Sequence, residues 1–251
     1  MRLATLRRGG RDGTLVVVNA SGTLGAPVKG YAILQAVLDD WETAQAALLA
    51  AQATVEGGGG EMLAPGALAA PLPRAWQWLD GSAFATHGKL MQQAFNLPPI
   101  ETDRPLMYQG MSHQFLGPLD DVPLPSEDDG IDFEGEFGVI TGEVPMGCTA
   151  REALGHVKLV VQINDWSLRA IAPVEMKTGF GWVQAKPACS VAPFAVTPDE
   201  LGDAWHEGRV CLPLTVEVNG AWFGSPSGAA MDIGFDVLIA HAARTRSLPA
   251  G

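Results

Sequence analysis

The chain has 251 residues, enough to bury a sizeable core in one large domain or in a small domain joined to a larger one. Its formal net charge is −12 and no run of Lys or Arg is longer than Arg7-Arg8, which argues against nucleic acid as a partner. The three cysteines, Cys148, Cys189 and Cys211, form no C-x-x-C pair, so the sequence predicts reduced thiols and gives no support to a disulfide framework or a thiolate zinc site.

The N-terminal segment predicts a short hairpin followed by a helix. Residues 3–19 indicate two strands around the turn RRGGRDG. The apolar stretch TLVVV is too short for the hydrophobic region of a secretory signal, and Pro and Gly interrupt the longer apolar runs, so we expect a soluble, cytoplasmic protein without a membrane span. Helical spacing of apolar residues over 31–52 predicts an amphipathic helix with a buried face made of Leu34, Val37, Leu38, Trp41, Ala44 and Leu48.

A composition change marks a domain boundary near residue 70. Four glycines at 57–60 and the Pro-rich stretch PGALAAPLPRA are typical of a flexible connection. We therefore predict a small N-terminal domain over 1–70 and a larger domain over 71–251.

Beyond the boundary, short β-rich segments dominate. Strands are predicted over 134–141, 156–165, 211–220 and 221–224. Helices are predicted after Thr149, which forms a capping box with Glu152, and over 235–246. Many strands with few helices indicate a β-rich α+β fold of mixed strands rather than a doubly wound sheet.

The segment GIDFEGEFGVIT places Asp132, Glu134 and Glu136 at alternate positions of a predicted strand, so their side chains share one face. One interpretation is the solvated face of an antiparallel strand. The other is a cation site, because the apolar strand VKLVVQIND ends at Asp165, where ligands are commonly held. Glu134, Glu136 and Asp165 together suit a hard cation such as Mg²⁺, Mn²⁺ or Ca²⁺, with Asp132 as an outer neighbour.

Two further segments carry candidate residues. Residues 105–118 indicate an ordered loop in which His113 is a candidate general base, although a loop histidine is more often structural. The other four histidines, His87 among them, are interpreted as structural. Lys186 could offset the carboxylate charge and Arg169 could hold a substrate carboxylate, and surface ion pairs are the alternative for both.

Together the motifs YQGMSHQFLGP, IDFEGEFGVI, VQINDWSLR, GFGWVQAKPA and AVTPDELG resemble the fumarylacetoacetate hydrolase family, and its bacterial two-domain members in particular. The resemblance covers the chain from residue 1 to 251 in order. It implies a mixed-strand catalytic domain rolled into a distorted barrel behind a small N-terminal domain, assembled as a homodimer.

The resemblance also implies roles for individual residues. Glu134, Glu136 and Asp165 match the metal carboxylates, and His113 matches the catalytic base. The positions that contact substrate in the family match Tyr108, Gln109 and Arg169. Arg169 and Lys186 also match catalytic positions of the family. Lys186 and Ser190 match positions near a second cation. A fourth metal carboxylate of the animal enzymes falls on Leu106 here.

The implied activity is metal-dependent hydrolysis of a carbon-carbon bond in a β-diketo acid, with fumarylacetoacetate, which gives fumarate and acetoacetate, as the leading substrate. Related acylpyruvate hydrolysis, oxaloacetate decarboxylation and isomerisation or hydration of dienoic diacids stay open. Because the chain stops at ARTRSLPAG where family members continue, we also expect a missing C-terminal portion. The alternative to an enzyme is therefore a catalytically silent binding or structural remnant.

Overall fold

The computed structural model describes residues 1–95 and 102–251. The N-terminal part contains, in order, β1 (Arg2–Leu6), β2 (Thr14–Val18), β3 (Leu24–Pro27), α1 (Leu34–Asp39), α2 (Trp41–Glu56) and β4 (Glu61–Met62). The rest contains β5 (Leu79–Gly81), α3 (Ala85–Phe95), β6 (Met107–Gln109), β7 (Ile131–Asp132), β8 (Gly135–Thr141), α4 (Ala150–Ala153), β9 (Val157–Asn164), β10 (Ser167–Leu168), α5 (Ala172–Thr178), β11 (Ser190–Val191), β12 (Ala195–Val196), β13 (Trp205–His206), β14 (Arg209–Val210), β15 (Val216–Val218), β16 (Ala221–Gly224) and α6 (Phe235–Ala242). No helix within these two ranges has the length and hydropathy needed to cross a bilayer.

The predicted N-terminal hairpin is confirmed. β1 and β2 pair antiparallel, with Arg2 opposite Val18 and Leu6 opposite Thr14. The chain returns to β2 through Gly13, whose φ is +64°, and a Cβ at this position would clash with the Leu6 carbonyl oxygen. Only glycine fits a turn with this backbone conformation and this close an approach.

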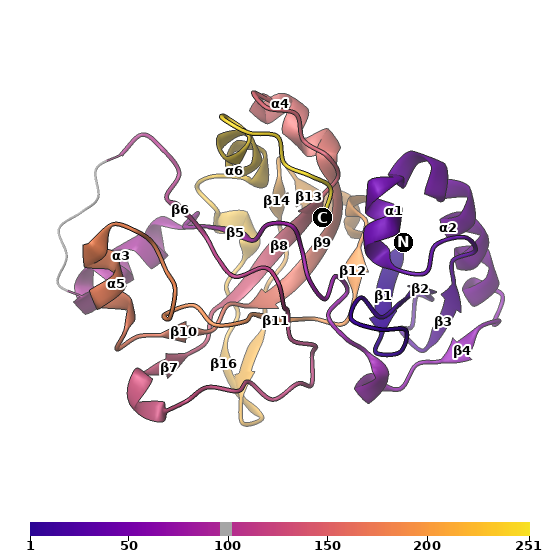
Figure 1. The fold of residues 1–251 in the computed structure, drawn as a ribbon, viewed down its shortest axis with the longest axis horizontal. Coiled ribbons are helices and arrows are strands. Elements are labelled where there is room, and N and C mark those ends of the chain that lie inside the picture. Colours follow the sequence, from indigo (N-terminus) through magenta and orange to yellow (C-terminus); the bar gives the residue numbers. More distant parts are fainter. Residues whose placement is uncertain (96–101) are drawn as a thin grey trace.

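The helix predicted over 31–52 is two helices in the structure. Asp40, between α1 and α2, has φ −130° and ψ 37°, outside the helical region. Its carboxylate accepts a 2.5 Å hydrogen bond from the Tyr31 hydroxyl, and this bond stabilises the break. The predicted apolar face is nevertheless buried, except that Trp41 is only half-buried, and α2 packs over β2 and β3 (Figure 1).

One antiparallel sheet joins the two parts of the chain. Its order is β11-β9-β12-β1-β2-β3-β4, and β8 pairs with β9. Because β1 pairs with β12, Arg2 opposite Val196, the N-terminal hairpin extends the sheet of the second part (Figure 1). The β-rich α+β class and the small N-terminal part are confirmed, but the described strands form an open sheet and not a closed barrel. The division at residue 70 stays a prediction.

A shared core makes this sheet a rigid platform. One buried cluster contains apolar side chains of β1 and β2 together with three from β9, namely Leu159, Val161 and Ile163. Full burial of each such side chain stabilises the fold by about 1.5–3 kcal/mol. The end of β9, which precedes Asp165, is therefore held firmly in place.

The remaining predicted elements are largely confirmed. β8 and β9 pair along their length, and Thr149 and Glu152 form the predicted capping box at α4. The strand predicted over 211–220 is shorter, because only 216–218 form β15. Pro213 has no N–H for a ladder, and the Leu214 N–H bonds to the Pro226 carbonyl instead.

Candidate active site

The candidate site lies where the ends of several strands meet. Asp80 of β5 stands opposite Tyr108 of β6. Glu134 and Glu136 flank the first residue of β8, and β9 ends one residue before Asp165. The backbone N–H of Asp165 donates to the Glu134 carbonyl at 2.9 Å, which ties the two predicted acidic segments together.

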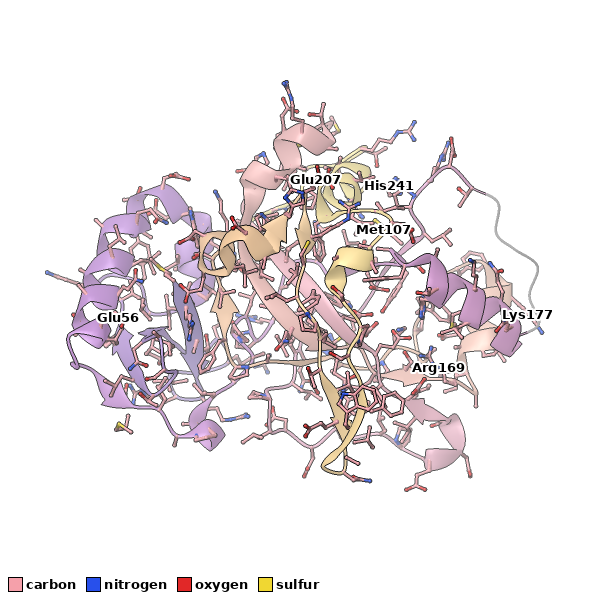
Figure 2. The ribbon with its side chains drawn as sticks, turned by 180° about the vertical axis from the view of Figure 1, so that it is seen from behind. Glu56, Met107, Arg169, Lys177, Glu207 and His241 are labelled. Carbon is pink, nitrogen blue, oxygen red and sulfur yellow. The ribbon has the colours of Figure 1, made fainter. Side chains whose placement is uncertain are left out.

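A cavity of about 1360 Å³ opens over these strand ends. This exceeds the roughly 300–1,000 Å³ of typical small-molecule sites. Its walls combine apolar side chains of β8, α3 and α6 with a polar group that comprises Asp80, His87, Tyr108, Glu134, Glu136, Arg169 and Lys186. Figure 2 shows Arg169 at the end of the molecule that lies away from Glu56 of α2. A small organic acid therefore fits beside several charged groups.

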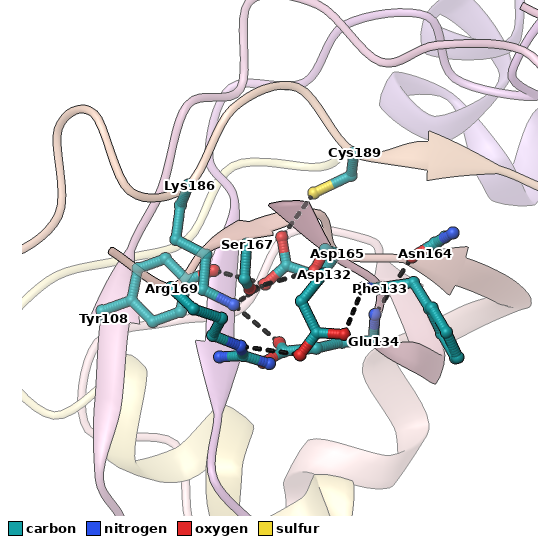
Figure 3. Close-up of polar contacts among 10 residues, drawn as sticks. All are labelled: Tyr108, Asp132, Phe133, Glu134, Asn164, Asp165, Ser167, Arg169, Lys186 and Cys189. Carbon is teal, nitrogen blue, oxygen red and sulfur yellow. Dashed lines mark hydrogen bonds and ion pairs between the residues drawn. The ribbon is translucent and has the colours of Figure 1, made fainter. Parts of the chain in front are cut away.

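Two cations neutralise Glu134. Lys186 Nζ lies 2.6 Å from Glu134 Oε2, and Arg169 lies 2.6 Å from Glu134 Oε1, while Arg169 Nε also bonds Asp132 at 2.8 Å (Figure 3). Burial acts to raise the pKa of Glu134, but the charges and hydrogen bonds of Lys186 and Arg169 outweigh it and lower the pKa. Glu134 is therefore ionised and engaged on both oxygens.

Asp165 is fully buried and accepts three side-chain hydrogen bonds. Its Oδ2 receives the Tyr108 hydroxyl at 2.6 Å and Lys186 Nζ at 2.8 Å, and its Oδ1 receives the Cys189 thiol at 2.9 Å (Figure 3). Burial, followed by the charge of Asp165, raises the pKa of both Tyr108 and Cys189. Both groups therefore keep their protons and act as donors to the carboxylate.

Within residues 1–95 and 102–251, the carboxylates grouped closely enough to hold a metal ion are Asp80, Glu136 and Asp165. One oxygen from each lies within 4.8 Å of the others. Burial, followed by the charge of Asp165, raises the pKa of Asp80 to about 7, and burial with the charges of Asp80 and Asp165 raises the pKa of Glu136 well above its ordinary value. The three acids repel one another, and Lys186, the cation that bonds Asp165, also bonds Glu134. A cluster with only oxygen ligands and this excess of negative charge fits a divalent cation.

This cluster differs in one member from the predicted ligand set. The structure brings Glu136 and Asp165 together as expected, but Asp80 takes the third position while both oxygens of Glu134 face cations. Asp80 was missed because its strand is short and reaches the site only through pairing with β6. The available signal was an acid directly after the large apolar residues Trp78 and Leu79.

The structure places a different histidine near the charged groups. His113 is exposed, and it is absent from the cavity wall defined by the described residues. His87 of α3 is exposed as well, but it lines the cavity. Desolvation lowers its pKa, Arg169 and Lys186 act in the same direction, and Glu134 opposes them. A neutral imidazole beside the acids is suited to accept a proton. The role of His113 stays a prediction without a supporting contact.

The other predicted residues divide between the cavity and its surroundings. Tyr108 lines the cavity and packs edge-on against Trp182, with ring centroids 6.0 Å apart. Gln109 instead accepts a 3.1 Å bond from Arg246. The Ser190 hydroxyl accepts a 2.9 Å bond from Trp166, and no contact between Ser190 and Lys186 occurs in the described part of the chain, so their second-cation role stays a prediction.

The raised pKa of Asp80 predicts how the metal-free protein responds to pH. An unfolded aspartate ionises near its ordinary value of 3.8, whereas the folded protein keeps the proton up to about pH 7. The unfolded state therefore binds fewer protons in this window, and stability should fall as pH rises. Asp80 contributes at most about 1.4 kcal/mol per pH unit to this slope, and Glu136, whose pKa is also raised, acts in the same direction. Denaturant unfolding in chelator between pH 5 and pH 7 should show this slope in the parent and a shallower one in Asp80→Asn. Equal slopes would contradict the assignment.

Two family models match the chain. One, described as fumarylacetoacetate (FAA) hydrolase C-terminal, matches residues 77–251, and another, fumarylacetoacetase N-terminal domain 2, matches residues 1–74. Both fall in the order that the motifs predict.

Individual relatives agree with these matches. A 2,4-didehydro-3-deoxy-L-rhamnonate hydrolase of Sphingomonas sp. is 35% identical over 49% of this chain, and a human mitochondrial oxaloacetate tautomerase is 27% identical over 45% of it. The match spans only 41% and 36% of the length of these relatives. The crystal structure of a maleylpyruvate hydrolase from Sphingobium sp. SYK-6 with manganese(II) and pyruvate has a TM-score of 0.71 at 19% identity, over 100% of this chain and 86% of that one. On these matches, the chain belongs to the fumarylacetoacetate hydrolase family.

Proposed function

We propose that the protein is a divalent-metal-dependent hydrolase that cleaves a carbon-carbon bond in a β-diketo acid. The observation that carries the proposal is the cluster of Asp80, Glu136 and Asp165, whose oxygens lie within 4.8 Å of one another beside a cavity that also holds His87 and Lys186. Mg²⁺ is the expected cofactor, with Mn²⁺ or Ca²⁺ as alternatives that the same oxygen ligands accept.

The substrate class is supported by the relatives. The sugar acid named for the Sphingomonas hydrolase carries keto groups at C2 and C4, oxaloacetate is a 2-oxo acid, and the Sphingobium enzyme is named for maleylpyruvate. A 2-oxo acid is common to all three. Acylpyruvate-type diketo acids are therefore to be tested beside fumarylacetoacetate, the substrate expected from the sequence.

The residues of the cavity suit a hydrolytic route. A bound divalent cation would supply Lewis-acid polarisation of the keto oxygens. His87 takes a proton from water as the water oxygen bonds to the distal carbonyl carbon, and the carbon-carbon bond then breaks with its electron pair leaving as an enolate. The His87 imidazolium returns the proton to the enolate carbon, which gives an acid and a ketone. Lys186, which lines the cavity 5.5 Å from the centre of the Tyr108 ring, would supply positive charge to this site.

A substrate panel with a metal control tests this proposal. Fumarylacetoacetate, an acylpyruvate, oxaloacetate and a dienoic diacid are each followed by absorbance, with Mg²⁺ or Mn²⁺ and again with excess chelator. The proposal expects metal-dependent loss of diketo absorbance together with formation of two products. Metal-dependent turnover of oxaloacetate or the dienoate alone would overturn hydrolysis in favour of decarboxylation, tautomerisation or isomerisation.

Tautomerisation is the second candidate, because the human relative is named for it. This reaction needs only the transfer of a proton between carbon and oxygen. His87, which lines the cavity, can transfer that proton, and no water has to attack the substrate. Metal binding without turnover of any panel member would instead support a silent binding protein.

We also propose that the protein is a cytoplasmic homodimer. The hairpin of β15 and β16 carries Trp222 and Phe223, which are 70% and 62% exposed, so it offers an apolar surface for self-association. Light scattering after gel filtration should give twice the monomer mass. A monomer at all concentrations would contradict the proposal.

A further inference from the structure

Cys189 lies on a firmly held segment beside the metal cluster. Its side chain is only 1% exposed. Its backbone carbonyl accepts a 2.8 Å bond from the Leu116 N–H, and the next residue, Ser190, pairs with Asn164 of β9. Because Asn164 directly precedes Asp165, the thiol and the carboxylate are carried by paired strands of one sheet.

The contacts of Asp165 divide between its two oxygens. Tyr108 and Lys186 both donate to Oδ2, whereas Cys189 Sγ donates to Oδ1 at 2.9 Å (Figure 3). Within residues 1–95 and 102–251, the thiol is the one side-chain donor that reaches Oδ1. Loss of this bond would leave Oδ1 without a side-chain donor, so only the two bonds to Oδ2 would resist rotation of the carboxylate about its carbon-carbon bond.

From this arrangement we propose that Cys189 is a positioning residue, which orients the carboxylate of Asp165 toward the cation held with Asp80 and Glu136. The inference rests on the proposed metal site. Partners that orient a metal ligand typically change metal affinity by 10–100-fold when removed. The thiol bond fixes the orientation of Oδ1. Because a thiol is a weak donor, this oxygen keeps electron density for a cation.

Other thiols provide a control. Cys148 is also buried, at 7% exposure, but it packs in a separate core cluster with Val144 and its thiol bonds the Thr149 carbonyl. Removal of this sulfur tests the general effect of deleting a buried thiol.

The test is a calorimetric titration of metal-free protein with Mn²⁺ alone, with thermal melts of the same samples. Cys189→Ala should weaken Mn²⁺ binding by about 10–100-fold. Cys189→Ser, which keeps a donor, should stay within about threefold of the parent, and Cys148→Ala should match the parent. If Cys189→Ala does not fold, Cys189→Val removes the donor with nearly the same volume and should show the same loss.

Three results would overturn the inference. Unchanged Mn²⁺ affinity in Cys189→Ala, with or without a lower melting temperature, would show that the thiol is a packing residue. An equal loss in Cys189→Ser would assign the effect to shape and not to the hydrogen bond. Absence of saturable Mn²⁺ binding in the parent would overturn the metal site and this inference together, whereas the first two results leave the metal site intact.

Discussion

The Glu136→Gln variant should lose Mn²⁺ binding by at least about 100-fold, because loss of a direct ligand should exceed the 10–100-fold cost of removing an outer partner. Glu136 shares the cluster with Asp80 and Asp165, and burial together with the charges of these two acids raises its pKa, so a bound cation would favour its ionised form. The amide keeps the shape of the side chain but removes the negative charge. Metal-dependent turnover of any panel substrate should fall at least as steeply.

Calorimetry on matched variants checks this prediction. Glu217→Gln, a change of the same chemistry on the exposed strand β15, should bind Mn²⁺ like the parent. Asp80→Asn should weaken binding alongside Glu136→Gln. Glu134→Gln decides between the two ligand sets: a loss equal to that of Glu136→Gln would place Glu134 among the ligands, as the strand pattern predicts. Parent-like affinity in Glu136→Gln would contradict the site.

The His87→Ala variant should lower kcat by about 10²–10⁴-fold while Mn²⁺ affinity stays near that of the parent, since this is the usual cost of removing a general base. His87 lines the cavity, and its lowered pKa keeps the imidazole neutral near pH 7. Steady-state kinetics on the substrate identified by the panel measure the loss. The acid limb of the pH–rate profile should disappear with the imidazole.

His113→Ala is the matched control for this experiment. His113 lies outside the described cavity wall, which His87 lines, so the structure predicts little change in kcat. If His113→Ala caused the large loss and His87→Ala did not, the base would be the residue that the sequence motif indicates. The comparison separates the two assignments on whichever panel substrate the protein turns over.

Local sequence patterns predicted much of the candidate site. Strand alternation and strand ends are set by neighbouring residues, so Glu136 and Asp165 were found, and Lys186 does lie between Glu134 and Asp165. The pairing of β8 with β9 follows from two long apolar strands. Local periodicity does not predict the register between distant strands. The position of Asp80 depends on that register, because β5 reaches the cluster by pairing with β6.

Other differences arise from contacts between distant side chains. His87 lies in an ordinary helical context, and only the packing of α3 on the cavity gives it a role. At the break, Asp40 accepts a hydrogen bond from the Tyr31 hydroxyl, nine residues earlier in the chain, and helical periodicity does not report this contact. Sequence therefore predicted the elements and part of the acid cluster, whereas tertiary contacts bring His87 to the cavity and Asp80 to the cluster.

The most direct test of the metal site is an anomalous difference map from crystals soaked in Mn²⁺. We predict one strong peak among Asp80, Glu136 and Asp165, at about 2.0–2.6 Å from their carboxylate oxygens, the range of oxygen-bound divalent cations. The peak should vanish in Glu136→Gln. A strong peak at another position, or no peak while these carboxylates keep their present arrangement, would contradict the account.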